Sequence, residues 1–153
     1  IGGAEIDRFG NINTSYIGDP QHPAVKLPGS GGAADIAAMA KRLLAIMNHE
    51  ERRLVEKVDY VTSPGYLDGG GARLEAGLNG GPAAVITDRG VLRPWGEENE
   101  LHLSSLHPGH DIAEVQRHTG WNLKVMPSLA ETPPPTSKEL AALHEVDRDG
   151  FWR

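Results

Sequence analysis

Apolar residues recur with a helical period along residues 33–48. Six of them share one stripe: Ile36, Met39, Ala40, Leu43, Leu44 and Met47. Ile36, Ala40, Leu43 and Met47 lie three or four positions apart, and Met39 and Leu44 widen the stripe; this spacing predicts a single amphipathic helix with one buried face. Under this interpretation Met39 and Met47 are core residues.

Shorter apolar runs between turn residues predict β-strands. These runs are residues 58–62, 83–87, 91–93, 101–106 and 123–126, with short extended pieces at Ile12 and Ile17. Two more helices are predicted to begin after Asp111 and Thr136, because each of these residues is followed three positions later by a glutamate, the spacing of a capping box. Strands that alternate with helices predict an α/β fold, with a mixed or mostly parallel sheet flanked by helices.

Composition and charge narrow the class of protein. The 153 residues suffice for one domain with a core. The net charge of −6 argues against nucleic acid as a partner, because neutralising phosphates requires clustered Lys and Arg. The lack of cysteine excludes disulfides and thiolate metal sites. Since no run approaches the ~18 apolar residues of a membrane span and no secretory signal is recognisable, we expect a cytoplasmic protein without a membrane partner.

Three glycines precede the predicted helix in Leu27-Pro28-Gly29-Ser30-Gly31-Gly32-Ala33. Glycine permits positive φ and a close approach to the backbone. A helix N-terminus adds unpaired N–H donors and a partial positive charge. Together these features predict a site for a phosphate, a carboxylate or a developing oxyanion. A tight turn before a helix is the alternative that the glycines alone leave open.

Several segments of the chain form a recognisable series. The first is Gly2-Gly3-Ala4-Glu5-Ile6-Asp7-Arg8-Phe9-Gly10-Asn11-Ile12-Asn13. It is followed in order by residues 17–19, 27–36, 58–66, 85–88, 103–109 and 119–120. Together these segments resemble the β subunit of family I CoA-transferases, close to the glutaconate CoA-transferase type. Their order and spacing are specific and extend over nearly the whole chain. The resemblance implies a CoA-transferase-like fold, a single β-type domain over residues 1–153, and coenzyme A as a substrate with no cofactor.

The resemblance also implies an activity. CoA would move between an acyl-CoA and a carboxylic acid through an enzyme glutamyl-CoA thioester, which is nucleophilic catalysis. We expect Gly31 and Gly32 to donate N–H groups to the oxyanion. Four further residues are candidates for substrate or CoA binding: Gly29, Ser30, Asn11 and Asn13. Ser30 has a favoured alternative as a helix cap, and the asparagines have one in stabilising turns.

The family's nucleophile is a glutamate in an E-x-G motif upstream of the segment that ends at Asn13. The chain starts downstream of that position, so we expect it to lack the N-terminal part of the subunit. We interpret Glu75-Ala76-Gly77 as a chance match and expect Glu5 to have a structural role. The expected partners are the missing upstream segment, a CoA-transferase α subunit, or both. Phe151 and Trp152 are candidate contacts, with packing on the chain's own core as the alternative.

Two other functions stay open: a CoA-thioester hydrolase of the same fold, including ring-opening hydrolases, and a non-catalytic module that supports a catalytic subunit. A metal at His107 and His110 is disfavoured, because no cysteine or well-spaced third ligand accompanies them. A hydrolase triad of His107 with Ser63, Ser104 or Ser105 is rejected, because the chain has no G-x-S-x-G motif.

Overall fold

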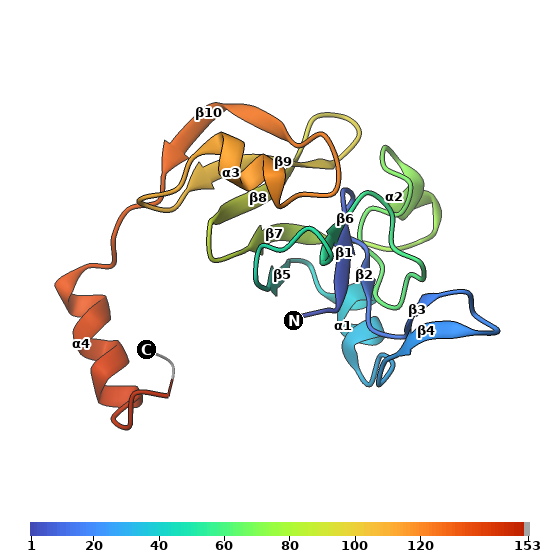
Figure 1. Cartoon of the computed structure of the whole chain (residues 1–153), viewed down its shortest axis with the longest axis horizontal. Helices are drawn as coiled ribbons and strands as arrows, with labels where there is room; N and C mark the ends of the chain where they lie inside the picture. Colours follow the sequence, from blue (N-terminus) through green and yellow to red (C-terminus); the bar gives the residue numbers. More distant parts are fainter. Residues whose placement is uncertain (152–153) are drawn as a thin grey trace.

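The largest element of the fold is a five-stranded mixed sheet (Figure 1). The computed structural model describes residues 1–151. The strand order is β10-β9-β8-β7-β5, formed by Lys124–Glu131, Glu100–Leu106, Gly90–Trp95, Pro82–Ile86 and Leu43–Ile46. β5 and β7 are parallel, as are β9 and β10, whereas β8 is antiparallel to both neighbours. The predicted α/β class with a mixed sheet is therefore confirmed, together with the strands predicted between residues 83 and 126.

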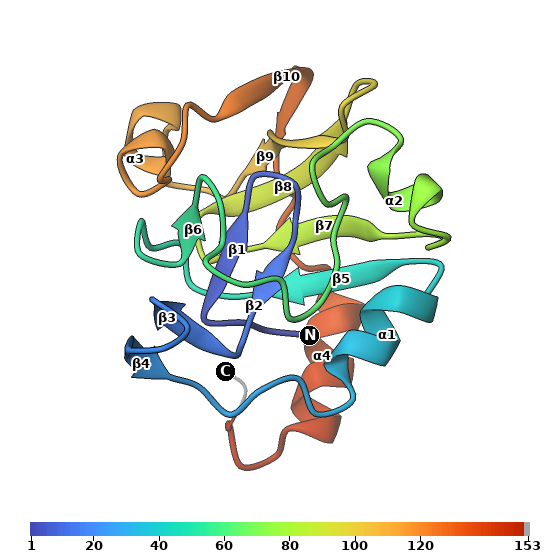
Figure 2. The same cartoon turned by 90° about the vertical axis from the view of Figure 1, so that its right-hand side faces the viewer.

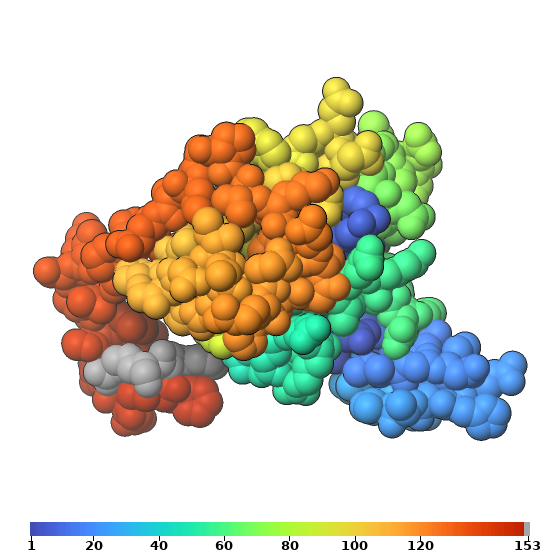
Figure 3. All heavy atoms as spheres, turned by 45° about the horizontal axis from the view of Figure 1, so that its top comes forward, coloured from blue at the N-terminus to red at the C-terminus, as the bar shows by residue number. Residues whose placement is uncertain are grey.

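A smaller sheet covers one face of the large one (Figure 2). It contains β1 (Glu5–Asp7), β2 (Ile12–Asn13) and β6 (Leu54–Val55), with β1 in the centre. The core between the two sheets includes Ile6, Ile12 and Leu54 from the small sheet, and Leu92 and Leu103 from the large one. A separate hairpin, β3 (Tyr16–Gly18) and β4 (Pro23–Lys26), lies at the end of the molecule opposite the C-terminal helix α4 (Ser137–Val146) (Figure 3).

The predicted helix over residues 33–48 is wrong in its second half. Helix α1 covers only Ala33–Met39 and ends at Ala40, which has extended backbone angles (φ −69°, ψ 133°). Residues 43–46 form β5 instead, with alternating buried and exposed side chains. The apolar stripe was ambiguous, because its second half also fits the period of a half-buried strand. Met47 lies in the core as expected, but Met39 is 77% exposed.

The predicted strand over residues 58–62 is also wrong. Only Ser63 forms a β-bridge, to Ile12. Side chains hold this loop in place: the Asp59 carboxylate accepts a hydrogen bond from the Gly18 N–H (2.7 Å), and the rings of Tyr60 and Tyr16 lie 5.2 Å apart. The residues typical of strands at positions 58–62 therefore belong to a loop next to the small sheet, and not to a strand.

Both predicted N-caps are confirmed. Thr136 and Glu139 form a complete capping box at the start of α4. Asp111 caps α3 (Ile112–Arg117) by accepting from the Glu114 N–H, but the Glu114 carboxylate does not return the bond and binds Arg89 and His110 instead. Phe151 is 77% exposed and so does not pack on the core, while Trp152 lies outside the described residues. Among residues 1–151, no helix has the length and apolar character needed to cross a bilayer.

A buried arginine joins α1 to the loops around it. Arg73 lies in α2 (Ala72–Glu75), a short helix that sequence analysis missed. Its guanidinium donates five hydrogen bonds of 2.7–3.1 Å to backbone carbonyls of Ala37, Pro64, Gly65, Asn79 and Gly80. Burial lowers the pKa of Arg73 from its ordinary value. Because all five N–H groups of a guanidinium are used, no other side chain can replace it.

We predict that Arg73→Lys lowers the free energy of unfolding by about 2–4 kcal/mol. An ammonium has three donors, so at least two buried carbonyls lose their partner. Urea denaturation monitored by circular dichroism measures the effect. Arg93→Lys is the matched control, because Arg93 is exposed and donates one hydrogen bond, to Ala83 O. Equal stability of the two variants would contradict the proposed role of Arg73.

Candidate functional site

The glycine loop, residues 29–32, connects β4 to α1. Gly29 and Gly31 have positive φ (91° and 50°), a conformation that side chains disfavour. Gly32 is the N-cap of α1 and has φ −85°. This backbone conformation is open to any residue, so it does not by itself require a glycine at position 32. A Cβ built on Gly29, Gly31 or Gly32 would meet no other atom within 4 Å, which shows that the space above the loop is open.

Within the described part of the chain, the N–H groups of Ser30, Gly31 and Gly32 have no acceptor, and the two glycine N–H groups are the expected oxyanion donors. Gly31 and Gly32 are both exposed. The expectation that Ser30 caps the helix is wrong, because the Ser30 hydroxyl donates to the Gly31 carbonyl (3.1 Å). The loop therefore presents two adjacent donors to solvent, the arrangement that an oxyanion requires. Oxyanion donation itself, and ligand binding by Gly29 and Ser30, stay predictions.

The turn after β2 anchors the glycine loop. The Gly29 N–H donates to Thr14 O (2.8 Å), and the Leu27 N–H donates to Ser15 O (2.9 Å). The Thr14 N–H in turn donates to the Thr62 hydroxyl (3.0 Å), which joins the turn to the loop that covers the small sheet. The buried Thr14 hydroxyl has no hydrogen-bond partner within the described part of the chain. The turn thus has one hydroxyl next to the open loop, that of Thr14, whose hydrogen bonds are not used by the described residues.

Asn13 is fully buried and holds this turn together. Its amide Nδ2 donates to Glu5 Oε2 and to Tyr16 O, both at 2.7 Å. Its Oδ1 accepts from the Ser15 N–H (2.9 Å). A substrate could bind the Asn13 amide only by replacing one of these bonds, so the structure gives this residue a structural role and its role in substrate binding stays a prediction.

Asn11 is equally occupied. Its Nδ2 donates to both Asp7 carboxylate oxygens and to Leu67 O, and its Oδ1 accepts from the N–H groups of Gly65 and Leu67. These bonds hold Leu67 at φ 58°, an uncommon conformation for a bulky residue. As at Asn13, contact with substrate stays a prediction. What the structure shows is an amide that fixes a strained loop residue.

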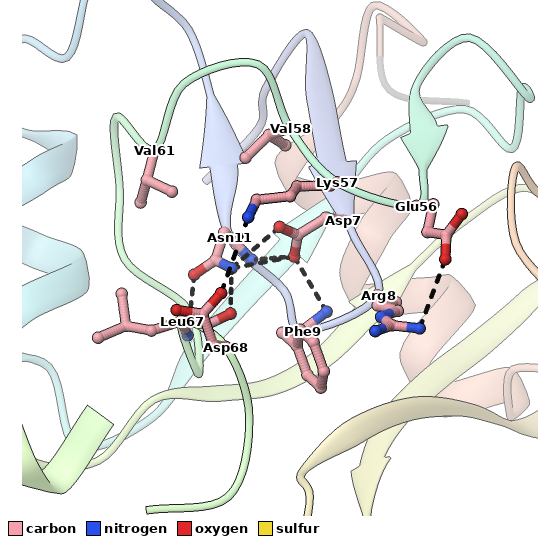
Figure 4. Close-up of a pocket in the computed structure, with 10 residues that line it drawn as sticks. All are labelled: Asp7, Arg8, Phe9, Asn11, Glu56, Lys57, Val58, Val61, Leu67 and Asp68. Carbon is pink, nitrogen blue, oxygen red and sulfur yellow. Dashed lines mark hydrogen bonds and ion pairs between the residues drawn. The ribbon is translucent and has the colours of Figure 1, made fainter. Parts of the chain in front are cut away.

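Asp7, Asn11 and Leu67 also line a cavity of about 680 Å³ (Figure 4). The cavity is further lined by Arg8, Phe9, Glu56, Lys57, Val58, Val61 and Asp68. The charges along its wall are paired, Arg8 with Glu56 (3.6 Å) and Lys57 with Asp68 (3.9 Å). Burial raises the pKa of Asp7, and the hydrogen bonds from Asn11 and the Phe9 N–H oppose that rise. The cavity therefore has mixed polar and apolar walls without an excess of positive charge.

A second polar cluster lies where β5, β7 and β9 end. Buried His49 contacts the hydroxyls of Thr87 (3.0 Å) and Thr119 (2.9 Å). Burial, reinforced by the charge of Arg89, lowers the pKa of His49 to about 4 from an ordinary value of 6.5. Sequence analysis missed His49 and Arg89, as it missed Arg73, because their partners are distant in sequence.

The histidines singled out in the sequence belong to the same polar region. His107 contacts Thr132 Oγ1 and Thr87 O, each at 2.9 Å, and His110 contacts Glu114 (3.0 Å). Within residues 1–151, no three His, Cys, Asp or Glu side chains are placed to hold a metal ion together. These contacts give both histidines structural partners.

The two glutamates considered as nucleophiles lie in different surroundings. Glu75 is exposed, in helix α2. Glu5 is buried in β1, next to Asn13. Neither carboxylate hydrogen-bonds to the glycine loop, and only Glu5 is connected to it, through Asn13.

The sequence and the fold of this chain are similar to those of known proteins. Residues 1–118 match the family described as Coenzyme A transferase. The chain is 44% identical over 148 residues to the B subunit of 3-oxoadipate CoA-transferase from Pseudomonas knackmussii, and the match covers 96% of the chain and 57% of that protein. It superposes on the crystal structure of glutaconate coenzyme A-transferase from Acidaminococcus fermentans with a TM-score of 0.85 and 39% identity, covering 95% of the chain and 56% of that one. The chain therefore belongs to the coenzyme A transferase family.

A ring-cleaving hydrolase is also similar. The cholesterol ring-cleaving hydrolase IpdB subunit of Rhodococcus jostii is 28% identical over 146 residues, which covers 95% of the chain and 57% of that protein. The chain spans little more than half the length of each of these relatives. Both alternatives for the chemistry, transfer and hydrolysis, thus occur among its relatives.

We predict that His49 makes the fold acid-sensitive between pH 6.5 and pH 4. The folded protein keeps His49 neutral down to about pH 4, whereas the unfolded chain takes up a proton below about pH 6.5. The stabilisation that depends on neutral His49 is therefore fully present above pH 6.5. As the pH drops to 4, its loss lowers the free energy of unfolding by up to about 3 kcal/mol.

Urea denaturation at pH 7.5, 6 and 5 measures this dependence. His49→Asn should flatten it, whereas His22→Asn, at an exposed histidine, should leave it as in the wild type. An unchanged pH dependence in His49→Asn would show that another group is responsible.

Proposed function

We propose that residues 1–153 are part of the β subunit of a cytoplasmic CoA-transferase, which moves CoA between an acyl-CoA and a carboxylic acid. The observation that carries the proposal is the 44% identity to the corresponding subunit of a CoA-transferase over nearly the whole chain. The exposed glycine loop supports it, because its two free N–H groups suit acyl-transfer chemistry. The P. knackmussii and A. fermentans relatives are named for 3-oxoadipate and glutaconate, both dicarboxylic acids, and we propose a short dicarboxylic acid as one substrate.

The proposed reaction is an exchange of thioesters. A glutamate supplied by the rest of the enzyme attacks the thioester carbonyl, and the C–S bond breaks to give an acyl-glutamyl anhydride and CoA thiolate. The thiolate then attacks the glutamyl carbonyl, which releases the first acid and leaves a glutamyl-CoA thioester. The same two steps in reverse, with a second carboxylate, regenerate the glutamate.

Each step in this sequence passes through a tetrahedral oxyanion. We propose that Gly31 and Gly32 donate their free N–H groups to it, while Gly29 and Ser30 shape the CoA side of the loop. A preset donor of this kind is worth about 3–4 kcal/mol of transition-state stabilisation. The open space above the glycines supports this role, because a side chain there would exclude the substrate.

Uncovered apolar surface supports association with further polypeptide. Ile36, Met39, Leu44 and Ile46 are exposed on α1 and on β5, which is an edge strand. The Ile1 amino group donates to Leu44 O (2.7 Å), and Ile1 O accepts from the Ile46 N–H (3.0 Å), which is the hydrogen-bond pattern of a parallel strand pair. We propose that another segment of the β subunit, a CoA-transferase α subunit, or both cover this surface.

Hydrolysis is the second candidate, favoured by the similarity to a ring-cleaving hydrolase. In that case water would replace the second carboxylate, and free CoA would be the product. An assay with an acyl-CoA and two different carboxylates separates the two functions. Transfer gives a new acyl-CoA in step with loss of the first, whereas hydrolysis gives free thiol.

We predict that residues 1–153 alone do not transfer CoA, and that activity appears when the α subunit and the remainder of the β subunit are supplied. The reason is that the family's E-x-G glutamate precedes the segment with which this chain begins to match. Exchange of CoA between two carboxylates, followed by chromatography, measures the activity. Transfer by the isolated chain would contradict the proposal, and loss of that transfer in Glu5→Gln or Glu75→Gln would then identify the nucleophile.

We predict that Gly32→Val lowers kcat of the assembled transferase by ~10²-fold. Valine can adopt the observed φ of −85°, so the fold should survive, but its side chain would fill the space where an oxyanion must sit. Gly71→Val is the matched control, since Gly71 is the N-cap of α2 and has φ −83°. A thermal melt accompanies the kinetics. Near-normal turnover of Gly32→Val would remove the loop from the mechanism.

A further inference from the structure

We infer that Glu5 is a positioning residue for the glycine loop, acting through the side chain of Asn13 and the turn at Thr14 and Ser15. The inference rests on the proposed function for its kinetic consequence. Its structural part stands on four hydrogen bonds that lead from one buried carboxylate to the loop.

The first bond joins two strands. Glu5 lies opposite Asn13 in the antiparallel pair β1–β2, and Glu5 Oε2 accepts from Asn13 Nδ2 at 2.7 Å. Glu5 is only 6% exposed, and no Lys, Arg or His side chain within the described residues forms an ion pair with it. A buried carboxylate without a cation depends on hydrogen-bond donors. The amide of Asn13 is therefore the main group that satisfies Glu5.

The carboxylate also decides which way the Asn13 amide faces. A carboxylate accepts hydrogen bonds, so the amide nitrogen must point toward Glu5 and the amide oxygen must point away. In that orientation Asn13 Oδ1 accepts from the Ser15 N–H at 2.9 Å. If the amide were flipped, its oxygen would face Glu5 and its nitrogen would face the Ser15 N–H. Both contacts would then be lost.

The turn passes this constraint to the loop. Thr14 O and Ser15 O accept from the N–H groups of Gly29 and Leu27, at 2.8 and 2.9 Å. The other hydrogen bonds of the loop stay within it or join it to α1, so among the described residues these two bonds are the ones that tie residues 27–32 to the β1–β2 hairpin. Precise placement of the two free N–H groups therefore depends on these anchors, and a displacement of about 1 Å is enough to impair catalysis.

The neighbouring acid–amide pair provides an internal comparison. Asp7, at the end of β1, and Asn11, just before β2, form a similar buried pair, each two residues from its counterpart in the Glu5–Asn13 pair. That pair leads to Gly65 and Leu67, and not to the glycine loop. A general loss of stability in the β1–β2 hairpin would follow from either pair, whereas loosening of the glycine loop should follow only from Glu5.

The experiment combines kinetics of the assembled transferase with amide hydrogen exchange of the segment at residues 27–32. Glu5→Ala should lower kcat about tenfold with KM little changed, and should speed exchange at Leu27 and Gly29 several-fold. Glu5→Gln should restore both, because the glutamine oxygen can accept from Asn13 Nδ2. Asp7→Ala serves as the control for exchange only, and should leave residues 27–32 protected as in the wild type.

Three outcomes would overturn the inference. In the first, exchange in Glu5→Ala is unchanged. In the second, Asp7→Ala speeds exchange at residues 27–32 as much as Glu5→Ala does, which would indicate a general effect on stability. In the third, Glu5→Gln is as impaired as Glu5→Ala in kcat with normal exchange, which would assign Glu5 a chemical role. If the wild-type assembly lacked transferase activity, the proposed function would fail while the exchange comparison still decided the structural part.

Discussion

The five hydrogen bonds of the buried Arg73 guanidinium hold helix α1 and the loops beside it in place. The guanidinium donates to carbonyls in α1, in the segment at Pro64 and Gly65, and in the turn before β7. Burying these carbonyls unpaired would be costly. Through the Ala37 carbonyl, Arg73 holds the C-terminal half of α1, the helix that follows the glycine loop. By holding Gly65, it closes a loop so tightly over Gly10 that a Cβ on Gly65 would lie 2.3 Å from the Gly10 carbonyl carbon.

The β1–β2 hairpin connects the core to the loops around the site. Its apolar side chains, Ile6 and Ile12, enter the core, while its acids and amides face the loops. Each acid fixes one amide, and each amide fixes backbone groups of a connection that has little regular structure. The Glu5–Asn13 pair and the turn at Thr14 and Ser15 position the glycine loop in this way. Strand alternation and buried polar pairs thus together position two free N–H groups in an open site.

Much of the fold could be predicted where local patterns are unambiguous, as in the strands on either side of the turn at Arg89. The boundary between α1 and β5 could not, because the same apolar residues fit both periods. The loop at residues 58–62 has the composition of a strand because Val58 is buried and Tyr60 packs on Tyr16. At the site, the glycine loop was apparent from the sequence, but the negative φ of Gly32 was not. A glycine can be required for a positive φ or for the room that a missing side chain leaves, and the sequence does not tell these two reasons apart. Arg73 had no signal, since its partners are backbone carbonyls, and the role of Asn13 depends on a strand register that only the structure supplies.

We propose that the glycine loop holds the oxyanion of acyl transfer. The most direct test is a crystal structure of the assembled enzyme with an acyl-CoA bound. We expect the thioester carbonyl oxygen to lie about 2.7–3.1 Å from the backbone nitrogen of Gly31 or Gly32. A thioester bound elsewhere, with both N–H groups facing only solvent, would contradict this proposal.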